Sequence, residues 1–136
     1  MIEVKNIKKV FGDKTIIEDV SSVMKAGQCN LIIGASGSGK TVLMKCMVGL
    51  FEPNEGEVLY SGESFTAMTG SDKTEIRKQI GMLFQGSALF DSQTVEQNVM
   101  FPLNMFTKDS YKEKLRRVNE VLERVNLVGA NKKFPS

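Results

Sequence analysis

The stretch from Ile32 to Lys45 reads IIGASGSGKTVLMK, and it decides which fold we expect. An apolar run ends abruptly at Gly34, a glycine-rich turn follows, and a second apolar run begins after the lysine. The segment Gly34–Thr41 fits the pattern G-x-x-x-x-G-K-[ST]. Glycines allow backbone conformations that a side chain forbids, so successive N–H groups can point at one anion. The stretch therefore predicts a phosphate-binding loop between a strand and a helix.

Individual residues of this loop have distinct expected roles. The helix after the loop directs its positive N-terminal end at the same anion. Lys40 adds a mobile charge for the β- and γ-phosphates, and the Thr41 hydroxyl can coordinate Mg²⁺. A glycine-rich turn that merely precedes a lysine is the alternative, and the strand-like and helix-like flanks argue against it. The expected nucleotide contacts in this region are Gly34, Ala35, Ser36, Gly37, Ser38, Gly39, Lys40, Thr41 and Val42.

Length and composition are those of an ordinary globular protein. The chain has 136 residues, a length that is enough for one domain with a core. Of these residues, 41% are hydrophobic and 25% are charged. A formal net charge of +2 gives no reason to expect a nucleic-acid partner. No apolar run approaches the roughly 18 residues that span a bilayer, and the first residues lack the apolar region of a signal peptide.

Cysteine and histidine usage narrows the possible chemistry. Cys29 and Cys46 lie among apolar neighbours, too far apart for a metal-binding pair, and are expected to be reduced, buried thiols. The chain contains no histidine. Histidine-ligated zinc, a Ser-His-Asp triad and a histidine general base are therefore excluded within these residues.

The rest of the chain alternates between strand-like and helix-like segments. Apolar runs of strand length predict strands, and Gly12 with Asp13 predicts a turn between the first two. The run after the phosphate-binding loop is apolar nearly all round, so it predicts a helix buried against a sheet. Strands are expected at 1–11, 16–27, 28–33, 57–63 and 80–85, and helices at 41–51, 71–79 and 110–125.

The segment 110–125 is the clearest helix. Ser110 and Glu113 have capping-box spacing, and Gly129 suits the end of the helix. Its charged face is expected to be solvated. The expected buried stripe is Leu115, Val118, Leu122 and Val125.

Two shorter helical segments have weaker signals. Ser71 or Asp72 is the expected N-cap of the helix at 71–79. A helical turn is expected from Thr94, with a stop at Pro102, because proline removes a hydrogen bond inside a helix.

Taken together, the order of these segments resembles the ATPase subunit of an ABC transporter, and the resemblance covers the whole chain. It implies an α/β fold of the P-loop NTPase type, with a RecA-like core and an antiparallel β subdomain. Residues 1–85 would form the nucleotide-binding core and the β subdomain. Residues 86–136 would begin the helical subdomain.

The resemblance also assigns residues that the loop pattern does not reach. Phe11 precedes the first turn where this family stacks an aromatic on adenine, an interaction of roughly 1–3 kcal/mol; an ordinary core aromatic is the alternative. Ile16 would flank the base. Gln85 would lie in the Q-loop near Mg²⁺ and the attacking water, since an amide offers both donors and an acceptor. The implied catalytic residues are then Lys40 and Gln85, and the implied metal-binding residues are Thr41 and Gln85.

The same resemblance implies binding partners for the chain. The stretch 86–103 is similar to the segment that forms a groove for the coupling helix of a transmembrane permease, in details closest to the phospholipid-trafficking, Mla-type branch. Leu89, Phe90 and Phe101 would be apolar anchors for that helix, or core residues. A second copy of the ATPase subunit and a location on the cytoplasmic, inner face of the cell membrane are also implied.

Several parts that the family needs for hydrolysis are not found. Phosphoryl transfer needs a carboxylate at the end of an apolar strand, and Asp91 lies too soon after Gln85 to supply it. The glycine-rich signature and the switch histidine come later in the family, and NKKFPS, from Asn131, resembles the lead-in to that signature. We therefore expect a truncated subunit that binds ATP without hydrolysing it. Its strand at 28–33 would lack a neighbour, which favours self-association.

Two alternatives stay open at this point. One is a catalytically silent nucleotide-binding or oligomerising module that is complete at this length. The other is a P-loop kinase or GTPase, although NKKF at Asn131 lacks the aspartate of a guanine-reading Asn-Lys-x-Asp motif.

Overall fold

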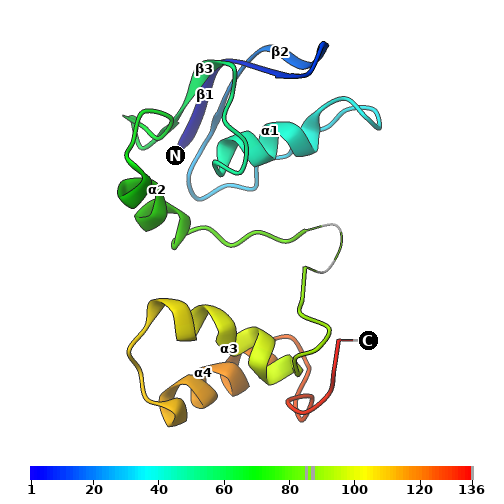
Figure 1. Cartoon of the computed structure of the whole chain (residues 1–136), viewed down its shortest axis with the longest axis vertical. Coiled ribbons are helices and arrows are strands. Elements are labelled where there is room, and N and C mark those ends of the chain that lie inside the picture. The colour runs from blue at the N-terminus through cyan, green and yellow to red at the C-terminus, as the bar shows by residue number, and fades with distance from the viewer. Residues whose placement is uncertain (85, 87, 136) are drawn as a thin grey trace. The chain divides into compact units, whose positions relative to one another are not determined.

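The computed structural model describes residues 1–84, 86 and 88–135. The chain divides into two compact units, Met1–Ile80 and Gly81–Ser136. Figure 1 shows a sheet with helices in the first unit and a helical second unit. No helix within the described residues is both long enough and apolar enough to cross a bilayer.

The N-terminal unit is built on one antiparallel sheet with strand order β2-β1-β3-β4. The turn between the first two strands begins at Gly12, whose φ of 56° lies in the left-handed region that glycine tolerates. The predicted turn and the first two strands are confirmed. The strands are β1 (Ile2–Phe11), β2 (Lys14–Met24), β3 (Glu55–Tyr60) and β4 (Glu63–Ser64).

The central strand β1 carries a bulge at Asn6. Its pairing shifts between Val4 and Ile7 on β2, and between Lys5 and Lys8 on β3. Asn6 has a φ of 49°, and its side-chain amide donates to Asp19 Oδ1 at 2.7 Å. Such an extra residue bends a strand and increases its twist. The bend lets the sheet curve around a helix.

That helix is α1 (Lys40–Met47), which packs against β1 and β2. It is shorter than predicted, and Met44 is exposed, so the prediction of burial nearly all round is wrong. The helix ends in a Schellman motif: Leu50 N donates to Lys45 O, and Gly49, with a φ of 72°, donates to Cys46 O. Leu43 and Met47 of this helix join the core of the unit, whose other members are Val4, Ile7, Ile17, Val58 and Phe65.

The strands predicted at 28–33 and 80–85 do not form in the described residues. The side chains of Leu31, Ile33 and Leu83 are 80%, 81% and 93% exposed, although their sequence is apolar. A strand is stable only when its backbone groups pair with a neighbouring strand. Within the described residues no strand pairs with either segment, so both remain irregular.

Two local predictions in the N-terminal unit are also corrected. Helix α2 (Gly70–Arg77) is capped by Thr69, not by Ser71 or Asp72. The hydroxyl of Thr69 accepts a hydrogen bond from Asp72 N. Cys46 is buried as expected, but Cys29 is exposed because it lies in the first of the irregular apolar segments.

The second unit consists of α3 (Val95–Phe106) and α4 (Tyr111–Arg124), packed through Met100, Val118 and Leu122. Thr94 caps α3 and forms a capping box with Gln97. The predicted stop at Pro102 is wrong, because the helix continues to Phe106. Packing of Met100 and Leu103 against α4 offsets the hydrogen bond that proline removes.

Both bounds of α4 lie within one residue of the predicted range 110–125, but the residue that ends the helix is not the expected Gly129. Ser110 and Glu113 form the expected capping box. The helix ends in a Schellman motif at Asn126, whose φ is 58°: Leu127 N donates to Leu122 O, and Asn126 N donates to Glu123 O. Gly129 therefore does not end the helix. Val125 is 57% exposed and leaves the predicted stripe, because it is already the C-cap residue.

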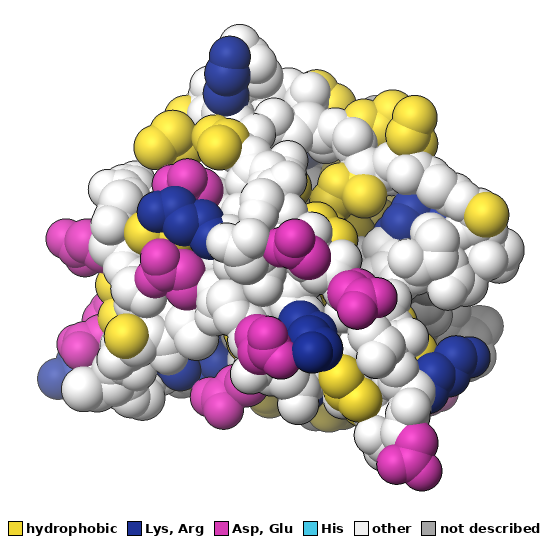
Figure 2. All heavy atoms as spheres, turned by 90° about the horizontal axis from the view of Figure 1, so that it is seen from above, with side chains coloured by type: hydrophobic (Ala, Val, Ile, Leu, Met, Phe, Trp, Pro, Cys, Tyr) yellow, Lys and Arg dark blue, Asp and Glu magenta, His cyan; other side chains and the backbone are white. Residues whose placement is uncertain are grey.

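Charged side chains of both signs reach the visible surface (Figure 2). On the part of the described surface seen in Figure 2, acidic and basic side chains are interspersed, and hydrophobic side chains reach the surface between them.

Candidate nucleotide-binding site

The loop Gly34–Thr41 turns sharply into the start of α1. Gly37 and Gly39 have φ values of 78° and 91°, in the region that favours glycine. Ser38 N donates to Ala35 O at 3.2 Å and closes the turn. Gly39 is the N-cap of α1 and has no side chain, so the first-turn N–H groups of the helix receive no side-chain cap. These donors are available to an anion, and the helix dipole favours one there.

The loop lies against β2 so closely that only glycine fits at one position. A Cβ atom on Gly39 would lie 3.0 Å from Ile16 O and 3.2 Å from Ile17 Cγ1. A Cβ atom on Gly34 would lie 2.8 Å from Ser38 Oγ. Ile16 therefore lies beside the loop, and its predicted contact with a base stays a prediction.

The functional side chains of the loop point in different directions. Lys40 Nζ donates to Gly34 O at 2.7 Å and to Ala35 O at 2.8 Å, so its ammonium group lies across the loop. Thr41 is exposed, and its hydroxyl is accessible to a ligand. The side chain of Val42 packs against the core, which leaves only its main-chain N–H for binding.

A hollow of about 350 Å³ lies beside the loop. Ser38, Gly39 and Lys40 line one side of it, and apolar side chains that include Ile16 and Ile32 line the other. Phe11 is not among the residues that line it. The structure therefore brings Ile16 and the loop together, and places Phe11 outside this hollow.

Phe11 has a defined environment of its own. Its ring packs edge-on against Phe51, with the ring centroids 5.2 Å apart. The ammonium of Lys9 lies 5.0 Å from the Phe11 ring centroid, and the same group donates to Glu52 O at 2.7 Å. Phe11 is partly exposed, so part of its surface is open to a flat ligand.

The residues present fit a nucleotide polyphosphate with its magnesium ion. The first turn of α1 supplies uncapped N–H donors, Lys40 supplies a cation, and Thr41 supplies a hydroxyl for the metal. Gln85, the other expected metal-binding and catalytic residue, lies outside the described residues. Within the described residues no cluster of three acidic, histidine or cysteine side chains could hold a metal alone. Such a cluster is not needed for Mg²⁺, which usually keeps several waters and binds through substrate phosphates and one or two protein groups.

Comparison with known proteins gives the family. The profile of the family described as ABC transporter matches residues 17–136, which include the whole loop and most of both units.

The chain belongs to the ABC transporter family.

Named relatives agree with this assignment. This ABC transporter chain is 40% identical over 134 residues to the probable ribonucleotide transport ATP-binding protein mkl of Mycobacterium leprae, covering 98% of the chain and 39% of that protein. It is 43% identical over 142 residues to the methionine import ATP-binding protein MetN of Escherichia coli K12, covering all of the chain and 40% of that protein. The chain thus spans about two fifths of the length of these relatives.

A solved structure confirms the fold class. The chain is similar to the ATP-binding cassette MJ0796, solved as a dimer in a post-hydrolysis state with ADP and Pi, at a TM-score of 0.88 and 29% sequence identity. The match covers 99% of this chain and 62% of that one. The ABC transporter chain therefore has the α/β, P-loop NTPase fold with an antiparallel β sheet.

The sequence did not predict the contacts of three residues, Phe51, Glu96 and Asn98. Phe51 contacts Phe11 from across the unit, a contact that no local pattern reveals. Asn98 and Glu96, at the start of α3, make polar contacts to segments on both sides in the sequence. The letters TVEQNVM, from Thr94 to Met100, are mostly polar, so nothing in them singled out these two residues.

Proposed function

We propose that this chain binds ATP with Mg²⁺ at the loop Gly34–Thr41, as the N-terminal part of a nucleotide-binding subunit of an ABC transporter. In the intact subunit, ATP binding and hydrolysis would drive transport. One observation carries the proposal: the uncapped first turn of α1 and the Lys40 ammonium lie at the same loop. Relatives named as ATP-binding proteins support it.

Each residue of the site has a defined task in this proposal. Lys40 exchanges the carbonyls of Gly34 and Ala35 for phosphate oxygens, which replaces two neutral acceptors with charged ones. The Thr41 hydroxyl holds Mg²⁺, which neutralises charge on the phosphates. Ile16 and Phe11 provide apolar surface for the base. Gln85 is proposed to assist the metal and the attacking water.

Binding without turnover is proposed for the 136-residue chain itself. Hydrolysis needs a carboxylate near the metal and a group that orients the water. The sequence has no histidine, and Asp91, its one candidate carboxylate after an apolar run, lies too soon after Gln85. These two features support a chain that retains ATP and releases no phosphate.

Amide resonances test the proposal on the full chain. Titrating ¹⁵N-labelled protein with ATP and Mg²⁺ should shift the amides of Gly37, Gly39, Lys40 and Thr41 more than those of α4, because the phosphates accept hydrogen bonds from them. Adenosine, which has the base and no phosphate, should leave the loop amides in place. Equal shifts with both ligands would contradict phosphate binding by the loop.

A permease partner is proposed for the second unit. Leu89, Phe90 and Phe101 are exposed, and the rings of the two phenylalanines pack with centroids 5.0 Å apart. A rigid, exposed aromatic pair suits an apolar helix of a transmembrane subunit. The proposed location is therefore the cytoplasmic, inner face of the cell membrane, bound to the permease.

The transported substrate is proposed to be a lipid or a related hydrophobic molecule. The similarity of residues 86–103 to the phospholipid-trafficking branch supports this. The two relatives named above carry ribonucleotide and methionine transport in their names, so substrate choice discriminates between branches. In the assembled transporter, phospholipid should stimulate ATP hydrolysis, and stimulation by methionine or a ribonucleotide alone would overturn the lipid assignment.

Self-association is the expected behaviour of the chain in solution. The irregular apolar segments expose Leu31, Ile33 and Leu83, and exposed apolar segments of β-forming sequence can pair with another copy. Light scattering over a wide concentration range should show a mass that rises above one chain. An Ile33→Lys, Leu83→Lys variant should shift the mass toward the monomer. A concentration-independent monomer for the unchanged chain would contradict the expectation.

A further inference from the structure

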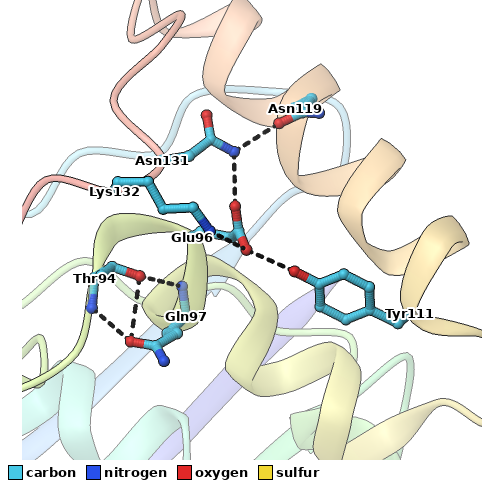
Figure 3. Close-up of polar contacts among 7 residues, drawn as sticks. All are labelled: Thr94, Glu96, Gln97, Tyr111, Asn119, Asn131 and Lys132. Atoms are coloured by element: carbon cyan, nitrogen blue, oxygen red, sulfur yellow. Dashed lines mark hydrogen bonds and ion pairs between the residues drawn. The ribbon is translucent and has the colours of Figure 1, made fainter.

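Glu96 is a buried carboxylate at a helix start, and three donors from two other segments contact it. It is 6% exposed, in the first turn of α3. Its Oε1 accepts from Tyr111 Oη at 2.9 Å, and Lys132 Nζ lies 3.4 Å from the same oxygen. Its Oε2 accepts from Asn131 Nδ2 at 3.1 Å. Figure 3 shows these donors approaching from the start of α4 and from the segment that follows it.

Main-chain hydrogen bonds also join the start of α3 to residues 131–133. Val95 N donates to Lys133 O at 2.8 Å, and Glu96 N donates to Asn131 O at 3.1 Å. Residues 131–133 therefore satisfy two N–H groups of the first turn of α3, which a helix cannot satisfy internally. We call residues 131–133 the 131–133 segment.

Asn98, two residues further along α3, holds a different loop. Its Oδ1 accepts from Phe90 N at 2.8 Å. Its Nδ2 lies within 3.1 Å of the carbonyl oxygens of Phe90, Gln93 and Thr94. These contacts fix the loop formed by residues 90–94, which carries one ring of the exposed Phe90–Phe101 pair.

We propose that the first turns of α3 form a junction that fixes both the 90–94 loop and the 131–133 segment, with Glu96 as the positioning residue for the segment. A displacement of the loop then moves the helix start and, through it, the segment. The link to transport rests on the proposed function, because the 90–94 loop would be moved by a permease bound at Phe90 and Phe101.

The electrostatics of Glu96 agree with a positioning role. Burial alone would raise the pKa of its carboxyl group, but the hydrogen bonds from Tyr111, Asn131 and Lys132 together lower that pKa below its ordinary value. The carboxylate therefore stays charged near neutral pH. In return, its hydrogen bond and its charge raise the pKa of the Tyr111 phenol.

The variant Glu96→Gln tests the proposal on the full chain. The substitution keeps the size of the side chain, but it removes the charge and places an amide donor among donors. By hydrogen exchange, the amides of Val95 and Glu96 should exchange about 10- to 150-fold faster, which is the range for losing one hydrogen bond to a charged group. Ultraviolet titration should show the pKa of Tyr111 falling toward its ordinary value. The pKa of Tyr60, raised by burial in the N-terminal unit, should not move.

A matched control separates positioning from a general effect on helices. Glu113→Gln removes a first-turn carboxylate from α4 and keeps a side chain suited to a capping box. It should leave the exchange of Val95 and Glu96 at the wild-type rate. If Glu96→Gln does not fold, Tyr111→Phe and Lys132→Met each remove one partner of the carboxylate and should accelerate exchange at the same two amides.

The junction is overturned by either of two results. One is wild-type exchange of Val95 and Glu96 in the Glu96 variant, or in both partner variants when that variant does not fold. The other is an Asn98→Ala variant that frees the amide of Phe90 and leaves Val95 and Glu96 unchanged. Binding of ATP at the N-terminal unit is measured separately, so a failed junction leaves the proposed function intact, and failed ATP binding leaves the junction intact.

Discussion

Replacing Gly56 with alanine should lower the free energy of unfolding of the N-terminal unit by about 3 kcal/mol or more. Gly56 lies on β3 opposite the bulge of β1, with a φ of 85°. A Cβ atom there would lie 2.3 Å from both Lys5 O and Asn6 O, which are backbone atoms that cannot rotate away. The sheet must open at its central strand, or the bulge must move.

Gly62→Ala is the matched control for this substitution. Gly62 lies in the same unit with a φ of 91°, but nothing lies within 4 Å of its Cβ position. The control should therefore cost only the backbone strain, about 1–2 kcal/mol. Hydrogen exchange of the β1 amides in increasing urea measures both variants. If both variants lose the same free energy of unfolding, a clash between the added Cβ atom and the bulge is not the cause of the loss at Gly56.

Local signals in the sequence predicted local structure well. Ser110 with Glu113 marked the start of α4, and Gly12 marked the hairpin turn, because a cap or a tight turn involves only residues near in sequence. Where two nearby residues could each cap or end a helix, the local sequence did not show which of them does so. Thr69 capped α2 in place of Ser71, and Asn126 ended α4 in place of Gly129.

Whether a segment forms a strand depends on a neighbouring strand, which the sequence of that segment does not reveal. The runs 28–33 and 80–85 have the composition of buried strands, yet neither forms a strand in the described residues. In contrast, β1 forms because β2 and β3 pair with it on both sides. Apolar composition predicts which segments can become strands, and pairing decides which of them do.

The same difference between local and long-range structure holds for the candidate site. The spacing of Gly34, Gly39 and Lys40 predicted a phosphate-binding loop, because such a loop is a local structure. The close approach of Gly39 to Ile16 and the packing of Phe11 on Phe51 join residues far apart in sequence. The Glu96 contacts with residues 131 and 132 are likewise long-range, and no spacing pattern encodes them.

Replacing Lys40 with alanine should weaken ATP binding by about 10- to 150-fold. In the proposed site Lys40 brings a positive charge to the phosphates, and a hydrogen bond to a charged group contributes about 1.5–3 kcal/mol. The fold should be unaffected, since the ammonium contacts only the carbonyl oxygens of Gly34 and Ala35 within the described residues. Lys45→Ala is the control, because Lys45 lies on the same helix over the ring of Phe51.

Titration calorimetry of ATP with Mg²⁺ into the full chain, the Lys40 variant and the Lys45 variant is the most direct measurement. The account predicts that the full chain and the Lys45→Ala variant bind with similar affinity, and that Lys40→Ala loses most or all of the binding heat. Equal affinity in all three proteins would contradict a nucleotide held by its phosphates at this loop.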